Sequence, residues 1–204
     1  MNIEQCLSMI SDALLGLSAI VVAVVAIMGL YAWRRELKGR VLFDVARKIM
    51  RLSIELKDNF EWARFPLSNS NESLGRQKAD NESEGESQIK DQWYARRNRL
   101  KPVIEGLQKL QGLDWEIQAL LGEKAEPIAN AIKVYRECYA NLTTAIDDYF
   151  DRRIRAVLTN SPSIDSDYDR ELLEIIYGRS VDGFSKKIDA AHEELLKALY
   201  PLVK

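Results

Sequence analysis

Residues 13–33 read ALLGLSAIVVAVVAIMGLYAW and contain no charged side chain. An α-helix rises about 1.5 Å per residue, so a helix of this length spans roughly 31 Å, close to the hydrocarbon thickness of a bilayer. Tyr31 and Trp33 stand at its C-terminal end, and aromatic rings favour the membrane interface. The stretch therefore predicts a single transmembrane helix.

The two flanks of this helix differ in charge. Residues 1–12 contain Glu4 and Asp12 but no Lys or Arg, which is unlike the basic start of a cleaved signal peptide, so we expect an uncleaved anchor. Residues 34–51 contain seven basic residues against two acidic ones. The positive-inside rule then predicts a short N-terminus (1–12) outside and residues 34–204 in the cytoplasm, at a plasma or bacterial inner membrane.

The basic residues nearest the predicted span form a cluster at the membrane surface: Arg34, Arg35, Lys38 and Arg40. We expect this cluster to set the orientation of the chain, and contact with anionic lipid headgroups is a second role open to it. Within the span, small residues recur every three or four positions, at Gly16, Ala19, Ala23 and Ala26. Such a stripe lets two membrane helices pack closely, although these residues are also common in any membrane helix.

Composition narrows the class of the protein. The 204 residues are 47% hydrophobic and 29% charged, with a net charge of -2 and two cysteines, Cys6 and Cys138. Two cysteines do not make a disulfide scaffold, and the hydrophobic content is too high for a disordered chain. No second charge-free run of spanning length is present, so the composition also argues against a transporter with several spans.

Apolar residues continue at helical spacing after the span. From Leu37 to Ala63 they recur every three or four positions, and the predicted membrane helix continues through residues 34–66 until Phe65-Pro66 ends it, as one rod near 75 Å long. Residues 67–87 are acidic and nearly devoid of apolar side chains, which predicts a flexible linker.

Residues 88–204 are expected to complete a cytoplasmic bundle. Pro102 should kink the helix of 88–121 or start a new one, Gly122 should end it, and Pro127 fits the first turn of the next helix. That helix has a heptad seam: Ile128, Ile132, Tyr135, Tyr139, Leu142, Ile146 and Tyr149. The last segment, 168–199, should be interrupted at Gly178 and Gly183. The fold prediction is all-α: a transmembrane helix that continues into an antiparallel bundle of about four helices.

The sequence contains few residues in the patterns that bind metal ions. A di-iron bundle needs two Glu-x-x-His motifs, and the chain has one histidine, His192. Two separated cysteines do not supply a zinc cluster. Asp165, Asp167 and Asp169 resemble the start of a calcium loop, but Arg170 and Ile176 stand where glycine and glutamate are needed, so helix capping is the better interpretation.

Two further charged groups have structural interpretations. Asp147 and Asp151 share a helix face, but arginines follow them, so surface ion pairs are expected rather than acid–base catalysis. A basic run near Trp93 suggests phosphate or base binding: Arg96, Arg97, Arg99 and Lys101. Because the whole chain is slightly acidic, nucleic-acid binding is not predicted.

The sequence contains no catalytic or cofactor motif, so we predict a non-enzymatic protein without a metal, cofactor or small-molecule substrate. The first hypothesis is a single-span scaffold or adaptor, whose partners are the bilayer and either another protein or further copies of the chain. The alternative is a membrane effector, of the defence or toxin kind, whose assembly perturbs the bilayer. A third is an enzyme without a recognisable linear motif.

Overall fold

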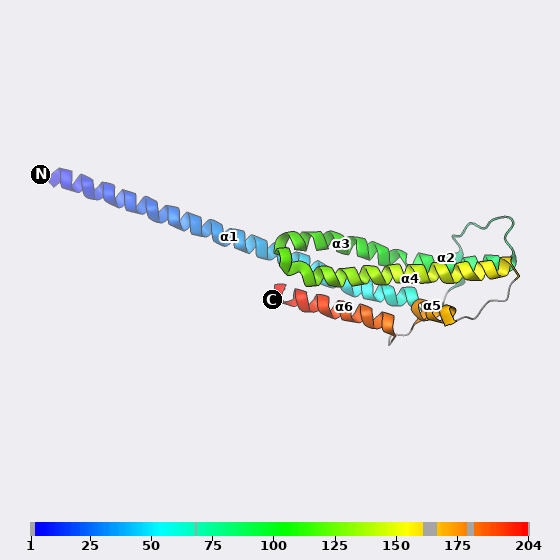
Figure 1. Ribbon diagram of the computed structural model, residues 1–204. Coiled ribbons are helices and arrows are strands. Elements are labelled where there is room, and N and C mark those ends of the chain that lie inside the picture. The colour runs from blue at the N-terminus through cyan, green and yellow to red at the C-terminus, as the bar shows by residue number, and fades with distance from the viewer. Residues whose placement is uncertain (1–2, 68, 161–166, 179–181, 204) are drawn as a thin grey trace. The chain divides into compact units, whose positions relative to one another are not determined.

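The structure, a computed structural model, describes residues 3–67, 69–160, 167–178 and 182–203, with residues 3–13 and Ser70 described by their backbone alone. All regular secondary structure in these ranges is helical, which confirms the all-α prediction. The elements are α1 (Ile3–Arg64), η1 (Ser70–Ser73), α2 (Glu84–Arg99), α3 (Lys101–Leu121), η2 (Gly122–Ala125), α4 (Glu126–Leu158), α5 (Asp167–Tyr177), α6 (Gly183–Leu199) and η3 (Tyr200–Leu202) (Figure 1).

Two compact units make up the chain, Met1–Asp44 and Val45–Lys204. The boundary lies inside α1, which shows no break after residue 33. Among the described residues, the first unit contains no element other than the N-terminal part of α1. The second unit contains the rest of α1 and all the other helices.

Helix boundaries follow local sequence signals. α1 ends at Arg64, because Pro66 disfavours the helical conformation of the residue before it. Pro102 occupies the first turn of α3, so it starts a new helix rather than kinking an old one. Gly122, at the end of α3, has φ +60°, which glycine adopts without strain. Pro127 lies in the first turn of α4, as the sequence predicts.

The start of α2 and the break before α6 depend on side-chain caps. α2 begins at Glu84, inside the stretch 67–87, because the Ser83 side chain accepts a hydrogen bond from the backbone N–H of Glu86. α5 ends at Tyr177, before Gly178. α6 begins at Gly183, and the Asp182 side chain accepts from the Ser185 backbone N–H. The expected interruption at the two glycines is confirmed.

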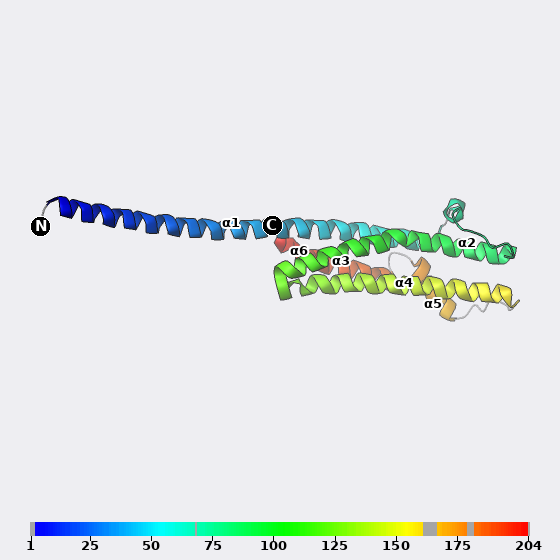
Figure 2. The same cartoon turned by 90° about the horizontal axis from the view of Figure 1, so that it is seen from above.

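In the second unit, α4 lies at the centre of the packing. It contacts α6, α2, α5 and α3. α2 and α3 follow one another along α4 in the opposite direction, and so do α5 and α6 (Figures 1 and 2). The end of α1 joins this core through Phe60, whose ring stacks on Tyr135 at 6.4 Å and meets Phe184 edge-on at 6.1 Å. The unit is a helical, bundle-like body.

The side chains of the apolar stripe of α1 are buried on one side of the boundary between the units and exposed on the other. Val45, Ile49 and Phe60 are at most 3% exposed. Leu37 and Val41, which continue the same spacing towards the N-terminus, are 52% and 43% exposed. The stripe is therefore a core element only from Val45 onward, where other helices are present to cover it.

Candidate functional site

The charge-free part of α1 is an exposed apolar surface. Its large apolar side chains, from Leu14 to Trp33, are between 46% and 70% exposed. Among the described residues, α1 is the one helix long and apolar enough to cross a membrane. The small residues of the predicted packing face all lie on this exposed helix: Gly16, Ala19, Ala23 and Ala26. No other atom lies within 4 Å of the position that a Cβ would take at Gly16, so that face is open.

The basic cluster that follows is also exposed at Arg34, Arg35, Lys38 and Arg40. Arg40 donates to the carboxylate of Glu36, one turn earlier. Within the described part of the chain, Arg34, Arg35 and Lys38 form no ion pair. These three charges therefore face the surroundings of the helix.

The predicted seam of α4 lies in the core of the second unit. Five of its members are buried and two are half-buried: Ile128, Ile132, Tyr135, Leu142 and Ile146 in the first group, Tyr139 and Tyr149 in the second. Ala131, Cys138, Ala145 and Phe150 are buried as well. A heptad seam buries two residues of every seven, and the buried face of α4 is wider than that. The reason is that helices pack against α4 from several sides.

Burial also affects the titratable groups on this face. It raises the pKa of both Tyr135 and the free thiol Cys138. The Tyr135 hydroxyl is buried and has no hydrogen-bond partner among the described residues. His192 on α6 is half-buried, and burial lowers its pKa. The buried thiol is typical of a core position, whereas a buried hydroxyl without a partner is unusual.

Among the described residues, three arginines are buried, and no pattern in the sequence predicts their burial. Arg64, Arg96 and Arg99 are 3–4% exposed. Arg64, at the end of α1, donates from Nε to the Ile175 carbonyl and from Nη2 to the Glu174 carbonyl, both in the last turn of α5. It also pairs with Asp182, and its Cζ lies 4.4 Å from the centre of the Phe184 ring.

Arg96 and Arg99 hold the chain that leaves α1. Both donate to the Phe65 carbonyl; Arg96 also donates to the Pro66 carbonyl and Arg99 to the Leu67 carbonyl. Arg99 pairs with Glu72 through Nε at 2.6 Å. Two members of the predicted basic run are thus internal structural groups. Lys101 is exposed, while Arg97 pairs with Asp147, which also accepts from the Trp93 indole.

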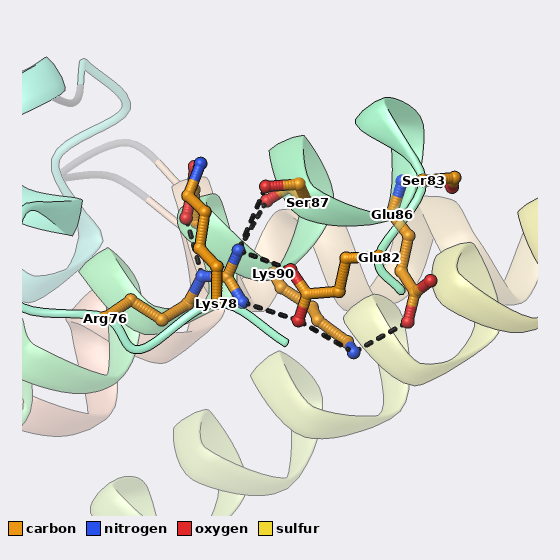
Figure 3. A network of polar contacts seen from close by, with 8 residues as sticks. Arg76, Lys78, Glu82, Ser83, Glu86, Ser87 and Lys90 are labelled. Atoms are coloured by element: carbon orange, nitrogen blue, oxygen red, sulfur yellow. Dashed lines mark hydrogen bonds and ion pairs between the residues drawn. The ribbon is translucent and has the colours of Figure 1, made fainter. Parts of the chain in front are cut away.

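The α1–α2 connection, residues 65–83, is held by a second group of charges (Figure 3). Arg76 donates to both carboxylate oxygens of Glu82, at 2.9 and 2.8 Å, and to Asp91 at 2.6 Å. The side chains of Arg76 and Glu82 are only 8% and 7% exposed. Lys90 bridges Glu82 and Glu86. The expected flexibility of 67–87 stays a prediction, but five of its charged side chains have partners: Glu72, Arg76, Lys78, Glu82 and Glu86.

Those partners shift the acid–base behaviour of the connection. The hydrogen bond from Arg76 lowers the pKa of Glu82 to about 2. The hydrogen bond from Arg99 likewise lowers the pKa of Glu72. At the α5–α6 joint, burial alone would raise the pKa of Asp182, but hydrogen bonds from Arg64 and Ser185 outweigh it and lower the pKa. All three carboxylates are therefore charged at neutral pH.

Two hollows in the second unit lie against charged groups. A cavity of about 140 Å³ is lined by Lys57, Phe60, Glu61, Arg64, Ser185, Ile188 and Asp189. Lys57 and Asp189 pair across it at 2.7 Å, so their charges cancel. An open groove of about 550 Å³ lies between α3 and α4, where buried Asp114 accepts from Gln111 and Gln118. The Ser185 hydroxyl in the first hollow accepts from Arg64 Nη1 at 2.7 Å.

The remaining predicted groups have ordinary partners. Asp151 pairs with Arg155 and Asp169 with Arg152, while Asp167 pairs with Arg170. Asp165, the first position of the calcium-like pattern, lies outside the described residues. In the described ranges, no three His, Cys, Asp or Glu side chains are placed to hold a metal ion.

The chain matches no known family model, no curated protein and no solved structure.

Proposed function

We propose that the chain is a single-span, membrane-anchored helical scaffold. Residues 13–33 cross the bilayer, and residues 45–204 form an antiparallel bundle of about four helices on the cytoplasmic side. The bundle acts through its surface, by contact with a protein partner or with further copies of the chain. The heptad spacing of α4 contributes to its interior packing.

One observation carries this proposal, namely the exposure of the charge-free part of α1. Burying a Val, Leu or Ile side chain is worth about 1.5–3 kcal/mol, and this helix displays a row of them over six turns. No other element of the first unit covers them. A bilayer covers such a helix on all sides and leaves its backbone hydrogen bonds intact.

Charge supports the orientation. The exposed basic cluster follows the apolar segment directly, and residues 1–12 contain no basic side chain. The positive-inside rule then favours the cytoplasmic side for the bundle. The second unit supports a scaffold role, since its buried arginines and aromatic rings make contacts within the protein and stiffen it.

Membrane integration is tested with the full chain carrying a C-terminal tag. We expect the wild type to stay in the membrane pellet after alkaline extraction, and the tag to be cleaved by protease only in inverted vesicles. Val22→Arg with Val25→Arg should release the chain, because each arginine at mid-span costs about 2.5–3.5 kcal/mol. Val22→Leu with Val25→Leu is the matched control and should remain in the pellet.

Retention of the double-arginine variant would contradict a membrane-spanning role for 13–33. Cleavage of the tag in intact cells would overturn the orientation. Membrane potential, measured with a dye during overexpression, separates the scaffold from the effector hypothesis. A scaffold leaves the potential unchanged, whereas a collapse that is suppressed by Ala19→Leu with Ala23→Leu would identify an effector.

A further inference from the structure

The open groove between α3 and α4 contains a buried carboxylate that has no charged partner. Asp114 of α3 lines this groove and is only 3% exposed. Its two oxygens accept from neutral amides, Oδ2 from Gln111 at 3.3 Å and Oδ1 from Gln118 at 2.9 Å. Among the described residues, Asp114 forms no ion pair. Buried charges in proteins are normally paired, so this carboxylate stands out.

The Gln111 amide adds a second acceptor beside the carboxylate. Its Nε2 donates to Asp114, which fixes the orientation of the amide and leaves Oε1 over. This oxygen is buried and has no hydrogen-bond partner in the described part of the chain. A carboxylate accepts about four hydrogen bonds, and two on Asp114 are taken. The α3 side of the groove therefore combines a negative charge with unused acceptors, which suits an ammonium group with its three donors.

The α4 side of the same groove carries positive charge. Lys133 and Arg136 line it, and both are exposed. Lys133 approaches Glu137 only to 3.9 Å, and such an exposed pair is weak. Arg136 forms no ion pair within the described ranges, and neither cation pairs with Asp114. A guanidinium group can bind a carboxylate through two parallel hydrogen bonds, so this side suits an anionic group.

An aromatic ring completes the groove. Trp115 lines it, next to Asp114 in the sequence, and is 66% exposed. A flat apolar group can stack on such a ring. The volume of the groove, about 550 Å³, lies within the range of small-molecule sites. The sequence shows no motif for a ligand here, because the two charged sides meet only when α3 and α4 pack together.

The two signs of charge narrow the class of ligand. A ligand with positive charge alone would meet Asp114 favourably but would be repelled by Lys133 and Arg136. A ligand with negative charge alone would be repelled by Asp114. A molecule that carries both an ammonium and a carboxylate group satisfies both sides of the groove at once.

We propose that the groove binds a free amino acid with a flat apolar side chain. The ammonium group donates to Asp114 and to Oε1 of Gln111, and the carboxylate accepts from Arg136. The apolar side chain packs on Trp115. All these residues belong to the second unit, so the proposal goes beyond the scaffold role and does not rest on the membrane anchor.

Calorimetric titration of the full chain, in an uncharged detergent at neutral pH, tests the proposal with L-phenylalanine as the probe. We expect a dissociation constant below about 1 mM for a ligand of this size. Two analogues each lack one charged group: 2-phenylethylamine has no carboxylate, and 3-phenylpropionate has no ammonium group. Each should bind about tenfold more weakly or worse, because a charged hydrogen-bonding partner stays unpaired. L-Alanine, which lacks the ring, should also bind more weakly.

Substitutions then assign each charged group of the ligand to its side of the groove. Asp114→Asn should remove the advantage of phenylalanine over 3-phenylpropionate, since the ammonium group loses its counter-charge. Arg136→Gln should remove its advantage over 2-phenylethylamine. Arg155→Gln is the matched control, an exposed arginine of α4 outside the groove, and should change neither ratio. Circular dichroism checks that the helices are retained.

Several results would overturn the proposal. One is the absence of saturable binding of phenylalanine up to about 10 mM, far above the expected dissociation constant. Tighter binding of 3-phenylpropionate would identify an anion site instead, and tighter binding of 2-phenylethylamine a cation site. Unchanged ligand ratios in Arg136→Gln would also contradict it. This exposed position keeps the test valid if Asp114→Asn fails to fold.

Discussion

The two ends of α1 show how similar apolar residues acquire different roles. Ile20, in the charge-free part, is 62% exposed, and Ile49, in the part belonging to the second unit, is fully buried. Around Ile20 the apolar residues occur on all sides of the helix, while around Ile49 they form one stripe that other helices cover. The helix is the same kind of element in both places, and the difference lies in what surrounds it.

One substitution applied at both positions tests this difference and has the largest expected effect. Ile49→Ala should lower the free energy of unfolding by about 3–4 kcal/mol, because three buried side-chain carbons are lost and a cavity remains. Ile20→Ala should change it by less than about 0.5 kcal/mol in detergent micelles, where micelle contacts replace packing. Urea titration followed by circular dichroism measures both. Equal costs would show that the two parts of α1 do not differ in packing.

A second matched pair compares arginines. Arg64→Ala should lower the free energy of unfolding by about 3 kcal/mol, because it leaves Asp182 and the last carbonyls of α5 without their donor. Arg35→Ala should change it by about 0.5 kcal/mol or less, since Arg35 is exposed. Arg64→Lys should recover only part of the loss, because an ammonium group lacks the planar fork that reaches all these acceptors. Full recovery with lysine would contradict this geometry.

Acid pH should give the smallest effect, and it should act on the second unit alone. Glu72, Glu82 and Asp182 have a lower pKa in the folded chain than when unfolded, so the unfolded state binds protons first as the pH falls. Their stabilising contribution is complete above about pH 5 and is lost towards pH 2. The urea midpoint should fall over this window.

Membrane retention supplies the control for the acid experiment. Residues 13–33 contain no Asp, Glu or His, so retention in the pellet should not change between pH 7 and pH 4. In Glu82→Gln the urea midpoint should depend less steeply on pH than in the wild type. An unchanged slope would mean that the contact between Glu82 and Arg76 contributes nothing to stability.

Local signals account for the part of the fold that the sequence predicts. The ends of α1 and α3 and the starts of α3 and α4 follow from Pro66, Gly122, Pro102 and Pro127, whose effects reach one turn at most. The spacing of apolar residues in α4 is also a local signal, and it predicts the buried face of this helix. α2 begins four residues before its predicted start, because Ser83 caps it and the helix dipole favours the acidic residues Glu84 and Glu86 in its first turn.

The contacts of the buried arginines could not be predicted from the sequence. Arginine is rarely buried unless paired, so a basic run is normally assigned to the surface. Arg96 and Arg99 are buried because carbonyls at residues 65–67, about thirty positions earlier, turn towards them. No local pattern indicates such partners. The ion pairs of the α1–α2 connection have the same origin, since Asp91, a partner of Arg76, lies 15 positions away in α2.

Arg64 also has a consequence for the order of events during synthesis. Its partners in α5 and α6 lie 110 to 121 positions later in the chain. When α1 has just left the ribosome, these partners have not yet been synthesised, and the guanidinium group forms hydrogen bonds with water. The last turn of α1 therefore lacks the partners of its arginine until nearly the whole chain has emerged, although Tyr135, which stacks on Phe60, is made earlier. Closure of the body around Arg64 is then a late step of folding, completed after the N-terminal helix has met its surroundings.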